Sequence, residues 1–470
     1  MQTQSPNGNG HIHDGHGTSA IPEDKKTELL ENLEDDWQDD PENPRIGVSQ
    51  RSGVAPLLYV SLYTFISPLA SSIMAPGLPD IATKYNLTNR DDHSIDLSIF
   101  LISFGVAPLF LAPLSEMYGR RWILNIGNLV TIGFNIGLSA HISPAAHLPP
   151  TTGALLAFRF LAGITGSAPI ACGGGVISDL FSERDRAAAM TIYSLGPLIG
   201  PVVGPIMGGF VTETVGIKYV FIIVAGAGGI ASAGNLRPSY PTKKSQKAAD
   251  PEKAALEHPV LVEQHSSKLH YLWINLSRPA ILLFRSTVCF LLSLYMAFMY
   301  GIYYLMFTTF SSLFSDTYGF TTGTGGLTYL GLGIGFILAT AVSAKTANEL
   351  YNYLVKKNGG KGEPEMRIPA LIFGSLFVPV GLFWYGWSAA AKIHWIMPII
   401  GSGIFGFGMM CTFLPIQLYL VDTFTYAASL PFFLLGFAFP LFGQQMFDAL
   451  GMGGGNSLLG GLAILLGIPL

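Results

Sequence analysis

One arginine stands inside an otherwise apolar segment of the sequence. Arg159 lies in LLAFRFLAGITGS, a run with the composition of a membrane-spanning helix. A charge is costly in hydrocarbon, so such a side chain faces protein or a water-filled cavity and commonly marks a functional site. Two interpretations are open. Arg159 belongs to a functional site, which its depth in the run favours, or it is a structural arginine that donates to backbone carbonyls.

Two short charged segments lie at the ends of apolar runs. PLSEMYGRR carries Glu116, Gly119 and Arg120, and SDLFSERDRAAAM carries Asp179 and Arg184. Gly119 suits a turn that needs a positive φ. Glu116 can pair with an arginine across a helix interface. The two segments could form an ion-pair latch that breaks and re-forms. The alternative is that their arginines only anchor the ends of the runs at a membrane face.

Glycine and proline recur every fourth residue in GPLIGPVVGPIMGGF. This segment holds Gly196, Pro197, Gly200, Pro201, Gly204, Pro205, Gly208 and Gly209. In a helix, a spacing of four places residues on one face. Such a helix is unfavourable in water, where each interior proline costs about 3 kcal/mol and each glycine about 1 kcal/mol. In a bilayer, unpaired backbone groups are penalised and neighbouring helices can compensate for proline. The glycine face therefore predicts that another helix approaches closely.

The composition excludes a soluble protein of this length. The chain has 470 residues, of which 50% are hydrophobic and only 12% are charged. Soluble domains have about 25% charged residues. The three cysteines lie inside apolar runs, so we expect small buried side chains and neither a disulfide framework nor a metal site. There is no HExxH motif, and we do not expect an enzyme.

Apolar runs of spanning length divide the chain into four parts. Residues 1–53 are polar and acidic and are expected to be a disordered cytosolic tail. Residues 54–234 contain six runs, of which the fourth is one continuous run from Thr152 to Ile177. Residues 235–284 form a polar cytosolic linker. Residues 285–470 contain about six more runs, which begin near Arg285, Gly325, Ile368, His394, Tyr426 and Asn456. The predicted fold is all-α, a polytopic membrane protein of two six-helix bundles.

The distribution of lysine and arginine sets the predicted topology. These residues gather in alternate loops and in the linker, which places those loops and the N-terminus in the cytosol. The sequon Asn86-Leu87-Thr88 then lies outside, where Asn86 could be glycosylated. The last two runs are poor. The final run stops at Leu470 after about fifteen residues, fewer than the roughly twenty that span a bilayer.

These motifs together resemble the major facilitator superfamily and, within it, the fungal twelve-helix drug:proton antiporters of the multidrug and polyamine type. PLSEMYGRR is similar to the superfamily's motif in loop 2–3, RFLAGITGSAPIACGGGVISDLF to its helix 4 motif, and GPLIGPVVGPIMGGF to the helix 5 antiporter motif. The resemblance implies that Arg159 takes part in proton coupling. It also implies that the two charged segments form a conformational latch and that a proton gradient, with no cofactor, supplies the energy.

The expected function is export of a small organic compound, such as a drug, toxin or metabolite, in exchange for protons. The partners would be that substrate and the lipid bilayer, with no nucleic acid, and the protein would be a monomer. Tyr303, Tyr304 and Gln417 are candidates to line the substrate cavity, although packing or lipid contact explains each equally well. We expect the plasma membrane, with the vacuolar membrane as the alternative. Compared with this family, the chain lacks residues between Val421 and Phe433 that would form loop 10–11 and part of helix 11. An uncoupled facilitator therefore remains an alternative function, as does a non-transporting or defective protein whose helices 11 and 12 are incomplete.

Overall fold

The computed structural model describes residues 50–84, 90–142, 151–180, 183–235, 286–359, 364–424 and 429–467. All regular secondary structure in these ranges is helical. The contacts within the chain define two units, Met1–Gly53 and Val54–Leu470, and the second holds the helical core. The predicted sequon at Asn86 lies outside the described residues, as do nearly all of the predicted acidic tail and linker.

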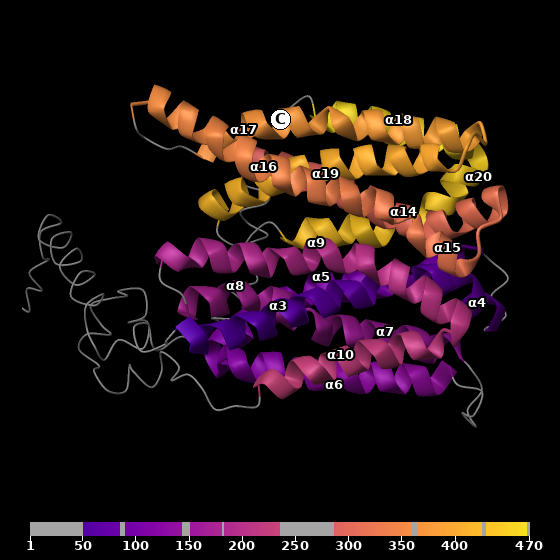
Figure 1. The fold of residues 1–470 in the computed structure, drawn as a ribbon, viewed down its shortest axis with the longest axis horizontal. Helices are drawn as coiled ribbons and strands as arrows, with labels where there is room; N and C mark the ends of the chain where they lie inside the picture. The colour runs from indigo at the N-terminus through magenta and orange to yellow at the C-terminus, as the bar shows by residue number, and fades with distance from the viewer. Residues whose placement is uncertain are drawn as a thin grey trace, which may run out of the picture. The chain divides into compact units, whose positions relative to one another are not determined.

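The first half of the core is built from long helices with local breaks (Figure 1). Its elements are α3 (Gln50–Ser72), η1 (Ala75–Gly77), α4 (Leu78–Lys84), α5 (Arg90–Tyr118), α6 (Arg120–Ile142), α7 (Thr152–Gly166), α8 (Ala168–Leu180), α9 (Glu183–Thr214) and α10 (Lys218–Asn235). The single run expected from Thr152 is divided at Ser167. Pro169 follows the break and has no N–H for the helical ladder, which accounts for the interruption.

The second half repeats this pattern. Its elements are α14 (Thr287–Tyr318), α15 (Thr322–Leu327), α16 (Leu330–Lys357), η3 (Pro364–Arg367), α17 (Ile368–Ser375), α18 (Phe377–Ala390), α19 (Ile396–Phe424) and α20 (Ser429–Gly467). Helix α14 begins after Ser286, whose side chain accepts a hydrogen bond from the Cys289 N–H at 3.3 Å. It ends at Gly319 in the left-handed conformation (φ 69°), a common helix C-terminus.

Helix α20 contains both of the last two predicted runs. Gly451 has a φ of 70° and a ψ of 168°, so the chain turns sharply there and continues as a second helical segment to Gly467. Helix α20 packs on α5, α14 and α18, and its second segment lies against α18. At 1.5 Å per residue the second segment is about 24 Å long, shorter than a bilayer core of about 30 Å.

The helices form two bundles. In the first half α5 and α6 pack on α7, and α6 packs on α10; in the second half α16 and α18 pack on α19, and α14 packs on α20. In Figure 1 the indigo to magenta helices lie together, and the orange to yellow helices lie together beside them. The main contacts between the bundles are α5 with α20 and α9 with α15.

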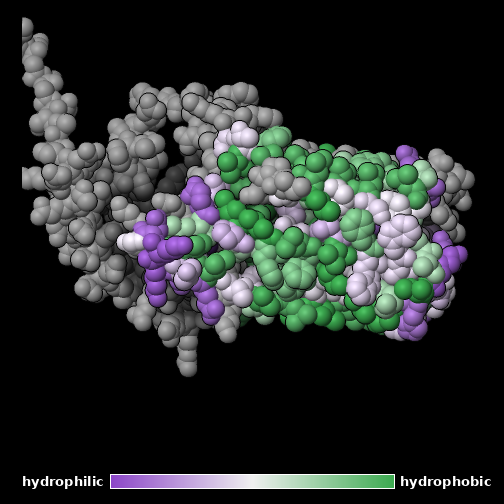
Figure 2. Space-filling model, turned by 90° about the horizontal axis from the view of Figure 1, so that it is seen from above, coloured by the Kyte–Doolittle hydropathy of each residue, from purple (hydrophilic) through white to green (hydrophobic). Residues whose placement is uncertain are grey.

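The surface of the core is suited to lipid. Among the described residues, nine helical segments are long and apolar enough to cross a membrane, and Lys218–Ser232 is a shorter apolar helix. Large apolar side chains such as Trp122, Leu129 and Ile230 are exposed by 60% or more. Figure 2 shows a broad hydrophobic surface on one face of the molecule, bounded by hydrophilic residues at both ends. The free cysteines Cys172, Cys289 and Cys411 are buried, and the predicted burial is confirmed. The protein therefore crosses the membrane many times.

Candidate functional site

Arg159 lies on α7 and is 1% exposed. Its Nη1 donates to the carbonyl of Ala70 at 3.1 Å, and its Nη2 donates to the carbonyl of Ser71 at 3.4 Å. Helix α3 ends at Ser72, so both carbonyls belong to the last turn, where a helix leaves its acceptors open. A cation at this position satisfies the carbonyls and opposes the negative end of the helix dipole. The ring of Phe100, 4.6 Å from the guanidinium carbon, supports the charge from α5.

Ser71 connects this arginine to the other half of the molecule. Its Oγ lies 3.0 Å from the hydroxyl of Tyr304 on α14, and it also lies 2.6 Å from the carbonyl of Pro68. The carbonyl of Ser71 thus accepts a hydrogen bond from Arg159, and the hydroxyl of Ser71 contacts the second bundle. The sequence pointed to Arg159 and Tyr304 separately. It gave no signal for Ser71, because a serine in an apolar run is common.

Tyr303 and Tyr304 belong to an aromatic cluster on α14 and α16. The ring of Tyr303 lies 4.7 Å from that of Phe307 and 5.4 Å from that of Phe336, and the ring of Tyr304 lies 5.0 Å from that of Tyr300. The Tyr303 hydroxyl is buried and has no hydrogen-bond partner among the described residues. The third predicted cavity residue, Gln417 on α19, is exposed. The structure brings the two tyrosines together, and their contact with a substrate stays a prediction.

The glycine face of α9 lies against α3. A Cβ atom at Gly196 would lie 2.8 Å from the backbone nitrogen of Phe65, and one at Gly200 would lie 2.7 Å from its carbonyl oxygen. At Gly204 the added atom would lie 3.0 Å from the Leu69 carbonyl oxygen, and at Gly208 it would collide with the Ile73 carbonyl. The predicted close approach of another helix is confirmed. The three prolines of the motif, Pro197, Pro201 and Pro205, remain within the helix.

Gly209 faces the other bundle. A Cβ at Gly209 would lie 2.6 Å from the carbonyl oxygen of Thr322, and a Cβ at Gly326 would lie 2.6 Å from the carbonyl oxygen of Pro205. The end of α9 and the start of α15 therefore meet backbone to backbone. The helix 5 motif thus packs on α3 through four glycines and on the second bundle through the fifth.

The structure describes part of the predicted latch. Gly119 separates α5 from α6 with a φ of 97°, as predicted from its position. Glu116 is exposed, and the guanidinium of Arg120 occupies the space beside Gly175 of α8, where a side chain would collide with it. The side chains of Asp179 and Arg184 lie outside the described part of the chain. The ion-pair latch therefore stays a prediction.

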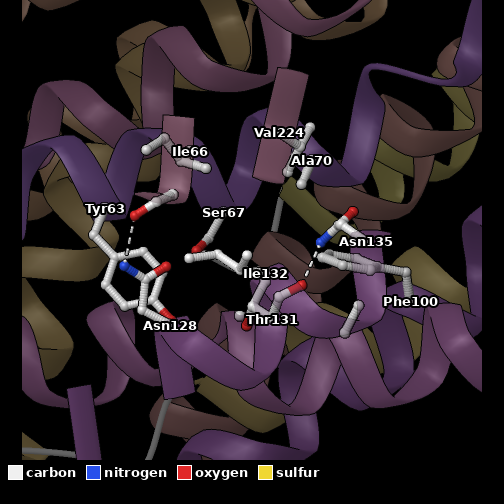
Figure 3. Close-up of a pocket in the computed structure, with 13 residues that line it drawn as sticks. Tyr63, Ile66, Ser67, Ala70, Phe100, Asn128, Thr131, Ile132, Asn135 and Val224 are labelled. Carbon is white, nitrogen blue, oxygen red and sulfur yellow. Dashed lines mark hydrogen bonds between the residues drawn. The ribbon is translucent and has the colours of Figure 1, made fainter. Parts of the chain in front are cut away.

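A small cavity with a mainly apolar lining lies inside the first bundle (Figure 3). Its volume is about 10 Å³, and its polar lining consists of Tyr63, Ser67, Asn128, Thr131 and Asn135. Asn128 donates to the carbonyl of Gly228 at 2.9 Å, and Asn135 donates to that of Thr131 at 2.8 Å. A cavity of this size has room for about one water molecule. It is too small for an organic molecule.

Comparison with known proteins agrees with this architecture. Residues 60–443 match the family model described as Major Facilitator Superfamily. The MFS-type transporter penM of Penicillium rubens is 41% identical over 445 residues, which cover 91% of this chain and 85% of that protein. The efflux pump radE of Floropilus chiversii is 36% identical over 471 residues, covering 96% of this chain and 85% of that protein.

A solved structure shows the same fold. The partially occluded inward open conformation of the xylose transporter XylE from E. coli matches with a TM-score of 0.68 and 12% sequence identity. The match covers 88% of this chain and 96% of that chain. At this identity the similarity shows the arrangement of helices and says nothing about the substrate.

Proposed function

The chain belongs to the major facilitator superfamily, and we propose that it exports a small organic compound from a fungal cell in exchange for protons. Such a transporter alternates between two states as its two bundles rock about a site near the middle of the membrane. We place this transporter in the plasma membrane, with its N-terminus in the cytosol. We propose that it works as a monomer and draws its energy from the proton gradient alone.

The observation that carries the proposal is the contact chain from Arg159 through Ser71 to Tyr304. The backbone carbonyl of Ser71 accepts a hydrogen bond from the buried Arg159 guanidinium, and the hydroxyl of Ser71 forms a hydrogen bond with Tyr304 of the other bundle. A movement of α14 that breaks the Ser71–Tyr304 bond would therefore act on the same turn of α3 that holds the guanidinium. Arg159 itself keeps its proton. It would couple proton movement to opening through its charge and its bonds, while another group or the substrate carries the proton.

The aromatic cluster supports an organic substrate. Tyr300, Tyr303, Tyr304, Phe307 and Phe336 present several rings and few polar groups, and such a lining suits an apolar ligand with a small number of hydrogen bonds. The unpartnered hydroxyl of Tyr303 could form one of these bonds. The direction of transport is supported by the relative that is named an efflux pump.

Uptake into everted plasma-membrane vesicles tests the proposal. We would screen a panel of fluorescent dyes and cytotoxic organic compounds in vesicles whose interior, the former outside of the cell, is acidic. Proton-coupled export predicts uptake above equilibrium that a protonophore abolishes. An uncoupled facilitator would equilibrate each compound at a rate independent of the pH gradient. Vesicles that behave like those without the protein across the panel would contradict export of these compounds.

A further inference from the structure

An acidic residue outside the predicted motifs joins the two bundles at one end of the molecule. Glu213 lies in the last turn of α9, next to Thr214. Its Oε2 accepts a hydrogen bond from the Gly323 N–H at 2.7 Å and another from the Thr321 hydroxyl at 3.1 Å. Both donors stand at the start of α15, more than one hundred residues away in the sequence. Hydrogen bonds accepted by an ionised carboxylate are about twice as strong as those between neutral groups.

The surrounding backbone shows that this contact belongs to a closed surface. Gly209 and Gly326 let the backbones of α9 and α15 come into contact, at positions one to two helical turns before Glu213 along α9. Thr212, the neighbour of Glu213, lies beside Gly77 of η1. The adjacent Pro76 accepts a hydrogen bond at 3.4 Å from Ser311 of α14. Four helical elements, two from each bundle, therefore meet here: α9 and η1 from the first, α14 and α15 from the second.

The charge distribution identifies which end of the molecule this is. The short connections near Glu213 are residues 215–217, between α9 and α10, and residues 319–321, between α14 and α15. The basic segments with Arg120 and Lys356 lie at the opposite ends of helices that cross the membrane. Under the positive-inside rule, Glu213 lies on the outer side.

We propose that Glu213 is the clasp of the outer gate, a residue whose carboxylate holds the two bundles closed on the outside and must release α15 each time the transporter opens outward. This inference rests on the proposed transport cycle. Its specific content is that the stability of the outward-closed state depends on two hydrogen bonds made by one side chain. Glu213 is a positioning residue, because it acts on the equilibrium between states and touches no substrate.

The accessibility of Ser311 reports on the gate without any transported compound. A Ser311→Cys variant in vesicles or proteoliposomes would be treated from the outer side with a membrane-impermeant thiol reagent. The three native cysteines are buried, so the new thiol is the intended target. Loss of a charge-assisted hydrogen bond shifts an equilibrium by roughly tenfold or more. Glu213→Ala should raise the labelling rate about tenfold, and Glu213→Gln, which keeps a neutral acceptor, should raise it about threefold.

Two controls make the experiment decisive. Thr214 is the next residue on the same turn, and within the described ranges its hydroxyl donates only to the carbonyl of Phe210 in its own helix, at 2.7 Å. Thr214→Ala should leave labelling at the rate of the parent. On the other side of the contact, Thr321→Val removes a donor to Glu213 and should increase labelling, whereas Thr321→Ser keeps the hydroxyl and should not.

A correctly folded Glu213→Ala protein that is labelled at the parental rate would overturn the clasp. If Glu213→Ala does not fold, the Thr321 pair decides in its place, and equal labelling of the Val and Ser variants would overturn the inference. The result is independent of the exporter proposal. A protein that shows no proton-driven uptake but responds to these variants keeps the clasp and loses the proposed energy coupling.

Discussion

The hydroxyls of Ser71 and Tyr304 lie 3.0 Å apart and form a hydrogen bond between α3 of the first bundle and α14 of the second. Ser71 stands in the last turn of α3, and its carbonyl accepts from Arg159. A single residue therefore contacts both the buried charge and the opposite bundle. A rigid turn of helix links the two contacts, so the geometry at Arg159 depends on whether the bundles are closed around Tyr304.

Tyr304→Phe tests this link. The change removes one hydroxyl and leaves the ring, and Ser71 keeps its bond to the carbonyl of Pro68. Loss of a neutral hydrogen bond between the bundles should destabilise the closed state by about 1 kcal/mol. We expect a lower rate of proton-driven uptake with little change in protein yield. Wild-type uptake at every pH gradient would show that the bond is incidental to transport.

Tyr303→Phe is the matched change one residue earlier. The hydroxyl of Tyr303 is buried without a partner among the described residues, so its removal relieves a desolvation cost. We expect an equal or higher thermal unfolding temperature in detergent. If the hydroxyl binds the substrate, the KM of uptake should rise at the same time. A lower unfolding temperature with an unchanged KM would instead assign Tyr303 to packing.

Arg159 is tested by a pair of substitutions. Arg159→Met fills a similar volume but leaves the carbonyls of Ala70 and Ser71 without their donors, and buried acceptors left unpaired cost about 1–3 kcal/mol each. Arg159→Lys restores a cation without the planar fork that reaches two acceptors. We expect both variants to reach the membrane, Met to abolish proton-driven uptake, and Lys to retain a small part of it. Full uptake by the Met variant would limit Arg159 to a structural role.

Sequence and structure agree where one physical constraint dominates. The glycine spacing of α9 predicted a close helix neighbour, because no other arrangement makes use of a bare face in a bilayer, and the structure identifies that neighbour as α3. Gly119 was expected at a turn with positive φ and is found there. Each of these predictions depended on the properties of a residue and its neighbours along the chain.

The contacts between distant segments were beyond the sequence. Glu213 follows the glycine motif without any local signal, and its partners Thr321 and Gly323 become visible only when α9 and α15 are placed together. The same holds for Ser71, whose contacts with Arg159 and Tyr304, 88 and 233 residues away in the sequence, could not be predicted from its own surroundings. The break of α7 and α8 at Ser167 was missed because hydropathy alone does not distinguish a continuous helix from a divided one.

Gly200→Ala tests the contact between α9 and α3. The new Cβ would lie 2.7 Å from the carbonyl oxygen of Phe65 and 3.1 Å from the nitrogen of Leu69, and backbone atoms cannot move aside cheaply. We expect destabilisation by about 1–3 kcal/mol, the usual cost of overpacking. Gly226→Ala on α10 is the control, because nothing lies within 4 Å of its added atom. Equal unfolding temperatures for the two variants would contradict the tight contact.

Gly175→Ala tests whether the position of the Arg120 side chain matters for transport without changing the stability of the fold. The added Cβ would occupy the place of the Arg120 guanidinium, which is the far end of a long side chain and can swing away. The unfolding temperature should therefore change little. This end of the core would nevertheless lose the contact of Arg120, at the start of α6, with α8, and if that contact belongs to the proposed latch, uptake should slow. Gly174→Ala, whose added atom meets only the end of Met190 at 3.8 Å, should leave uptake unchanged.

If both alanine variants transport at the wild-type rate, Arg120 has no part in a latch at this site. A slow Gly175→Ala beside a normal Gly174→Ala would support one, because the two changes differ only in which neighbour they displace.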